Sequence, residues 1–206
     1  VITNNHNPYK KKITVKKIWN DDENRDGYRS GEVTVQLYAD DKPTGKTENL
    51  NEENNWTASF DDLECNNKKI SDTEKTVPIV YTIREQNADG NTYLEDGEAY
   101  NEFYTVSYTG KSDDISDSEI LVTNTHEIEI TSFSGVKTWE DADNQDGKRP
   151  NEIIVSLFGK TTETEKKKVD SQKISSDENG EWKFEFKNLP KKENGVDIIY
   201  YVEEDA

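Results

Sequence analysis

Three polar residues follow runs of apolar residues, and their chemical groups are complementary. Lys17, Glu85 and Asn124 each continue a pattern in which every second residue is apolar. Residues two apart in a strand point to the same face, so each of the three is expected among side chains that form a core. The preceding apolar residues are Ile13 and Val15 for Lys17, Ile79, Tyr81 and Ile83 for Glu85, and Ile120 and Val122 for Asn124.

These three side chains are the parts needed to form an amide bond inside a core. Burial disfavours charge, so it lowers the pKa of a lysine and raises the pKa of a glutamate. A neutral Lys17 amine could then attack the carboxamide of Asn124, while Glu85 polarises the carbonyl and transfers protons, and ammonia leaves. This is a single self-modification. It needs no diffusing substrate, no cofactor and no metal ion, so we do not expect an enzyme.

A simpler interpretation places the three residues at strand ends, where polar side chains reach water. Recurrence favours the chemical interpretation. Lys17-Ile18-Trp19 returns as Lys137-Thr138-Trp139, at an offset of 120 residues (137 − 17), and the strand that ends in Glu85 returns as one that ends in Glu204. An offset of this size is the length of a domain, so the sequence predicts a tandem array of one module.

The ends of the chain are out of phase with this repeat. Val1–His6 matches Leu121–His126, so residues 1–8 are expected to be the closing strand of a preceding module. Residues 9–126 are expected to form a complete module, and residues 127–206 a second module that lacks its closing strand. Asn4 and Lys137 are therefore unpaired candidates for the same bond.

Two explanations of these ends stay open. The N-terminal strand of one molecule could complete the second module of the next, head to tail, because an incomplete sandwich exposes an unpaired strand edge and an apolar groove. A fragment trimmed by proteolysis would have the same ends without any such pairing.

Alternating apolar and polar residues predict strands in most of the chain, and no segment has helical periodicity. The breaks carry turn chemistry, as in Asp89-Gly90 and Asn179-Gly180. Roughly seven short strands per module predict an all-β fold of two tandem β-sandwiches of immunoglobulin-like size. The polar insertions Glu64 to Thr76 and Gln86 to Asn101 are expected to be surface loops, and Cys65 is expected to be an unreactive loop thiol.

The composition is that of a folded acidic protein. Charged residues make up 34% of the chain and hydrophobic residues 30%, with a net charge of −18, a balance that disordered chains share. Four Trp, ten Tyr and six Phe, placed at matching positions in both halves, are enough for two small cores. The negative charge argues against nucleic acid and anionic membranes as partners, and a single cysteine excludes a disulfide framework within the chain.

The acidic turn that begins at Asp22 offers a rival chemistry. Asp22 to Gly27 has the Asp-x-Asn-x-Asp-Gly opening of a calcium loop. The twelfth position is Val33 rather than a glutamate, and the residue that corresponds to Asp22 in the second module is Ala142. These departures favour a solvated turn with aspartate caps, and no metal site is expected.

The motifs resemble those of the Cna protein B-type (CnaB) domains of Gram-positive surface adhesins and pilins. The motifs are Lys-x-Trp, an acidic turn ending in Asp-Gly-x-Arg, a Tyr-x-x-x-Glu strand and a closing Thr-Asn-Thr-His. The resemblance implies a transthyretin-like, inverse immunoglobulin-like β-sandwich and an autocatalytic Lys–Asn isopeptide bond assisted by an acidic residue. These roles fall on Lys17, Glu85 and Asn124 in the first module, and on Lys137 and Glu204 alone in the second.

The resemblance also implies a place outside the cell, on the cell wall, and two functions of different class. The first is a stalk or spacer that holds another region away from the cell, or a pilus shaft subunit, with neighbouring modules of the same array as partners. The second is a module that itself binds a host extracellular protein through the first-module insertions, with Tyr93, Tyr100 and Tyr104 as contact residues. Repetition with divergent loops favours the spacer.

Overall fold

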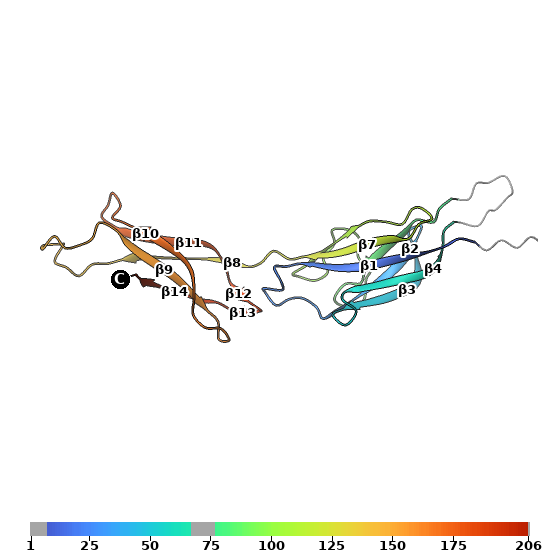
Figure 1. Ribbon diagram of the computed structural model, residues 1–206, viewed down its shortest axis with the longest axis horizontal. Coiled ribbons are helices and arrows are strands. Elements are labelled where there is room, and N and C mark those ends of the chain that lie inside the picture. The colour runs from blue at the N-terminus through green and yellow to red at the C-terminus, as the bar shows by residue number, and fades with distance from the viewer. Residues whose placement is uncertain (1–7, 67–76, 206) are drawn as a thin grey trace, which may run out of the picture. The chain divides into compact units, whose positions relative to one another are not determined.

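A computed structural model of the chain describes residues 8–66 and 77–205 (Figure 1). The chain divides into two compact units. Unit 1 comprises the residues up to Glu23 together with Tyr28–His126, and unit 2 comprises Asn24–Gly27 and the residues from Glu127 onward. Among the described residues every regular element is a strand, so the prediction of an all-β fold is confirmed. None of these residues forms a helix of the length and apolarity that a membrane crossing requires.

Unit 1 is a sandwich of two sheets. One sheet has the strand order β4-β1-β7-β6, and the other has the order β3-β2-β5. Their inward faces enclose one core, built from alternating apolar residues as the sequence predicts. The strands are β1 (Lys10–Asn20), β2 (Glu32–Ala39), β3 (Lys42–Asn51), β4 (Thr57–Glu64), β5 (Tyr81–Glu85), β6 (Thr105–Thr109) and β7 (Ser118–Thr125).

The first and last strands of unit 1 are neighbours. β1 and β7 pair in parallel, with Lys17 opposite Val122 and Trp19 opposite Asn124, and Figure 1 shows the two strands side by side. Ile13 and Val15 are fully buried on the inward face of β1. β5 belongs to the facing sheet, where Glu85 pairs with Val35 of β2. The two sheets therefore bring three distant parts of the sequence to one place in the core.

The described part of unit 2 also has seven strands, but β12 and β13 are only two residues long and pair with each other. One sheet has the order β10-β9-β14, and β11 pairs with β8 in a second sheet. β8 corresponds to β1, but no described residue pairs with the edge of β8 that corresponds to the β7 side of β1. The strands are β8 (Ile130–Lys137), β9 (Ile153–Lys160), β10 (Lys167–Ile174), β11 (Trp182–Pro190), β12 (Lys192–Glu193), β13 (Val196–Asp197) and β14 (Ile199–Glu204).

The open edge leaves the inward face of β8 only half-buried. Phe133 and Lys137 keep intermediate exposure, whereas Ile13 and Lys17, their counterparts in unit 1, are buried. The core of unit 2 is formed mainly by β9 and β11, and the aromatic residues of β11 in it are Trp182, Phe184 and Phe186, which are all buried.

The insertions of unit 1 contain buried residues that were not expected. The segment from Gln86 to Asn101 is not a wholly exposed loop, because Leu94 and Tyr100 are each only 5% exposed and belong to the core. Cys65, expected to be an unreactive loop thiol, lies just after the end of β4 and is only 1% exposed. The expected turns are confirmed at Gly90 and Gly180, where φ is +73° and +82°, a backbone conformation that glycine adopts without strain.

Candidate functional site

Lys17 is a fully buried lysine. Its side chain has no exposed surface, and its Nζ lies 3.4 Å from Oε2 of Glu85. The nearest carbonyl oxygens, of Ile18 and Val122, are 3.4 and 3.5 Å away, so their hydrogen bonds to the amine are long. Burial lowers the pKa of Lys17 to about 8, although the Glu85 carboxylate opposes this change. The neutral amine is therefore much more populated near neutral pH than it is in an ordinary lysine.

Glu85 lies between the other two predicted residues. Its side chain is also fully buried, and Oε1 accepts a hydrogen bond of 3.1 Å from Nδ2 of Asn124. Burial raises the pKa of Glu85, while Lys17 and the Asn124 hydrogen bond act in the opposite direction. Oε2 has no hydrogen-bond partner among the described residues, so its contact with Lys17 is an ion pair without a well-formed hydrogen bond.

Asn124 presents an unpartnered carbonyl to this cluster. The residue is fully buried, and its Oδ1 has no hydrogen-bond partner in the part of the chain that the structure describes. A buried carbonyl without a donor costs about 1–3 kcal/mol. A half-turn of the carboxamide would place Oδ1 against Glu85, where a protonated carboxyl could donate to it. The Asn124 carboxamide thus has an unsatisfied acceptor oxygen close to the Glu85 carboxyl group, which could donate a hydrogen bond to it.

The backbone of Glu85 is held by a tyrosine that the sequence analysis did not single out. The hydroxyl of Tyr108 accepts a hydrogen bond of 2.8 Å from the Glu85 N–H and donates one of 2.9 Å to the carbonyl of Leu94. Leu94 N–H in turn donates to the Glu85 carbonyl at 2.8 Å. This ring of contacts fixes the strand end that carries the glutamate.

The corresponding pair in unit 2 is more open. Lys137 Nζ lies 3.1 Å from Oε2 of Glu204, but the two side chains are 29% and 41% exposed. The described part of the chain places no asparagine beside them. The simple interpretation, in which polar residues at strand ends reach water, therefore describes unit 2, whereas in unit 1 the same residue types are sealed in the core. Asn4, the other unpaired candidate, lies outside the described residues.

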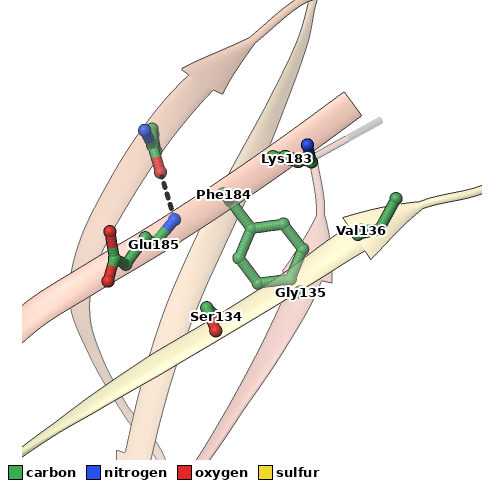
Figure 2. Close-up of a pocket in the computed structure, with 7 residues that line it drawn as sticks. Ser134, Gly135, Val136, Lys183, Phe184 and Glu185 are labelled. Carbon is green, nitrogen blue, oxygen red and sulfur yellow. Dashed lines mark hydrogen bonds between the residues drawn. The ribbon is translucent and has the colours of Figure 1, made fainter. Parts of the chain in front are cut away.

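A shallow depression on unit 2 is separate from these residues. Figure 2 shows it on the β8–β11 sheet, where the ring of Phe184 lies against Gly135. Gly135 corresponds to Val15, and a Cβ at this position would clash with the Phe184 ring. Neither Lys137 nor Glu204 lines the depression, so it is not a site for amide formation.

The sequence profile of the Cna protein B-type domain matches the chain twice, over residues 13–125 and 133–206. The chain belongs to the Cna protein B-type domain family. The chain is 38% identical over 204 residues to a collagen adhesin of Staphylococcus aureus, and the match covers 99% of this chain and 15% of the adhesin. This CnaB chain therefore corresponds to a small part of that relative.

A solved structure of two repeat units is similar to this CnaB chain. The crystal structure of two B repeat units of the collagen binding protein of Staphylococcus aureus is 36% identical, with a TM-score of 0.74. The match covers 97% of this chain and 45% of that chain. The fold of the CnaB chain is thus that of adhesin B repeats, a family of structural repeat domains rather than of enzymes.

Proposed function

We propose that this chain is a spacer segment of a surface adhesin, and that an amide between Lys17 and Asn124 locks its first module. The observation that carries the proposal is the contact of three fully buried groups, with Glu85 3.4 Å from the Lys17 amine and 3.1 Å from the Asn124 amide. The similarity to B repeats of an adhesin supports a location outside the cell, on the cell wall, among neighbouring modules of the same array.

The reaction begins with a proton transfer. The Lys17 ammonium gives a proton to the Glu85 carboxylate, which leaves a neutral amine beside a neutral acid. Burial favours both neutral forms, because separate charges are costly in a core and the pKa values of the two groups move toward each other. The Asn124 carboxamide then turns its Oδ1 to accept a hydrogen bond from the protonated Glu85.

The exchange of the Asn124 amide for the new amide then needs no external reagent. Lys17 Nζ attacks Cγ of Asn124, and a new C–N bond forms while the Oδ1 oxygen gains negative charge. Glu85 gives its proton to Nδ2 and takes the surplus proton from the attacking nitrogen, so it ends protonated as it began. The bond between Cγ and Nδ2 breaks, ammonia leaves, and the secondary amide remains. Proximity within a packed core replaces the binding of a substrate.

Intact-mass measurement tests the bond directly. The denatured chain should weigh less than its sequence by one molecule of ammonia, because only unit 1 contains the complete set of groups among the described residues. Lys17→Ala should restore the full mass, and the matched change Lys137→Ala in unit 2 should leave the loss of ammonia unchanged. A wild-type mass equal to that of the unmodified sequence would refute the crosslink.

Binding of a host extracellular protein is supported less well than a spacer role. The binding hypothesis placed contact residues at Tyr93, Tyr100 and Tyr104, but Tyr100 and Tyr104 are 5% and 2% exposed and belong to the core. Only Tyr93 keeps intermediate exposure. A locked module could serve in a pilus shaft as well as in a spacer, so the proposed bond fits either assembly.

Strand donation between chains stays a prediction. The open edge of β8 could accept residues 1–6 of a second copy, which would bring Asn4 toward Lys137. A denaturing gel of concentrated protein should then show a ladder that Asn4→Ala removes and Asn5→Ala, a change on the opposite strand face, retains. A gel and light scattering that show only monomer would contradict both the covalent and the non-covalent forms.

A further inference from the structure

An ion pair beside Lys17 recurs in both units and has no part in the amide-forming reaction. Arg29 donates to Asp21 through two hydrogen bonds, Nε to Oδ2 at 3.0 Å and Nη2 to Oδ1 at 2.5 Å. In unit 2, Arg149 donates to Asp141 through the same two atoms, at 2.9 and 2.5 Å. This two-point contact fixes the plane of each guanidinium group.

Each fixed arginine shares a tryptophan ring with the candidate lysine. In unit 1 the guanidinium carbon of Arg29 lies 5.6 Å from the centre of the Trp19 ring, and Lys17 Nζ lies 4.4 Å from it. In unit 2 the corresponding distances from Arg149 and Lys137 to Trp139 are 5.5 and 4.5 Å. The lysine amine, the indole and the arginine therefore form one repeated stack.

Packing, not hydrogen bonding, holds the indole in place. The Nε1 atoms of Trp19 and Trp139 are both buried, and neither has a hydrogen-bond partner among the described residues. Trp19 meets Trp56 and Tyr104 edge to face, with centroid distances of 5.4 and 5.1 Å. Two cations contact the indole, and Arg29 is the one that a carboxylate fixes in place.

The stack does not depend on a completed site. In unit 2 the lysine and glutamate are partly exposed and no described asparagine lies beside them, yet Lys137 keeps its place on Trp139 to within 0.1 Å of the distance in unit 1. The lysine therefore keeps its place on the indole without a neighbouring asparagine, while its contact with the glutamate is retained.

We propose that the Asp21–Arg29 pair is a positioning clamp, which holds Trp19 over the Lys17 amine and keeps water away from it. This inference deepens the proposed function and rests on it. Asp21 is 2% exposed, and the Tyr104 hydroxyl donates to its Oδ2 at 2.9 Å, so the clamp is anchored in the core of unit 1. Neither residue touches the reacting atoms, so their role is indirect.

The direction in which the pKa of Lys17 changes when Asp21 is neutralised distinguishes a clamp from a simple charge effect. The charged groups that face Lys17 are Glu85 and Asp21, which raise its pKa, and Arg29, which lowers it. Removing the charge of Asp21 would by Coulomb interaction alone lower the pKa of Lys17 further. Loosening Trp19 admits water to the amine, which moves the pKa up toward the ordinary value of 10.5.

The experiment uses the full chain with Asn124→Ala, in which the amide cannot form. The Lys17 side chain is followed by NMR as a function of pH, its signal being the one that Lys17→Arg removes. Adding Asp21→Asn should raise the titration midpoint by about one unit, and Asp141→Asn, the same change in unit 2, should leave it in place. A midpoint that falls or stays constant with Asp21→Asn overturns the clamp.

A second measurement concerns the reaction itself. In the chain that retains Asn124, Asp21→Asn should slow ammonia loss at pH 7 about tenfold, since one pKa unit changes the neutral fraction tenfold. Tyr104→Phe removes one anchor of Asp21 and should have a smaller effect in the same direction, which covers the case in which Asp21→Asn does not fold. If the wild-type chain never loses ammonia while the NMR midpoint moves as expected, the proposed bond fails and the clamp stands.

Discussion

Replacing Lys17 with methionine should lower the free energy of unfolding of unit 1 by about 4–5 kcal/mol. The change removes the amine and keeps most of the side-chain volume, so it deletes the proposed bond with little cavity formation. The Lys17–Asn124 amide would close a loop of 107 residues (124 − 17), which restricts the unfolded chain as a long disulfide loop does. The measurement is guanidinium unfolding of wild type and variant, followed by tryptophan fluorescence.

The matched control for this comparison is Lys137→Met in unit 2. That lysine is partly exposed and has no described asparagine beside it, so its replacement should change unfolding far less. Protease digestion should report the same order, with unit 1 of the Lys17 variant cleaved faster than unit 1 of the wild type. Equal unfolding midpoints and equal digestion rates for Lys17→Met and wild type would show that no stabilising crosslink exists.

Replacing Glu85 with alanine should abolish bond formation on the timescale of purification. Lys17 and Asn124 remain in place, but no group is left to take the ammonium proton or to donate to Oδ1. Loss of a positioned general acid and base slows a reaction by roughly 10²–10⁴-fold. Intact mass should therefore show full retention of the ammonia, in a protein that stays folded and melts at a lower temperature.

Glu85→Gln separates the two tasks of this residue. A glutamine can donate a hydrogen bond to the Asn124 carbonyl but cannot accept the proton of Lys17, so this variant should also retain its ammonia. Glu204→Ala, the corresponding change in unit 2, should leave the reaction in unit 1 intact. Normal ammonia loss in both Glu85 variants would remove Glu85 from the mechanism.

Much of this site could be predicted because strand alternation is a strict rule. A period of two assigned Ile13, Val15 and Lys17 to one face, and the structure buries all three. The same rule also reaches residues that the sequence analysis did not follow. Lys11 in β1 and Asp21 just after its end are each 2% exposed and have an acceptor or donor for their charge. The alternation was visible in the sequence, but it was followed only for the complementary groups of Lys17, Glu85 and Asn124 and for their counterparts in unit 2.

The burial of other residues could not be predicted from the residues next to them in the sequence. Leu94 and Tyr100 lie in a polar insertion without alternation, and their burial depends on long-range contacts that composition does not reveal. The difference in burial between Lys17 and Lys137 is likewise a property of neighbouring strands. Two nearly identical Lys-x-Trp motifs become a sealed site and an open one, according to whether a strand covers their edge.

The parallel pairing of β1 and β7 determines how tension would pass through the module. Both strands run in the same direction, and Lys17 and Asn124 lie near the ends of their strands. A pull on the array enters unit 1 along β1 and leaves it at the end of β7, so a bond between these residues would carry the load directly across. The intervening chain, about 350–390 Å when fully extended, would bear no force. A pulled array would then resist lengthening, and this resistance would not depend on the stability of the sandwich fold.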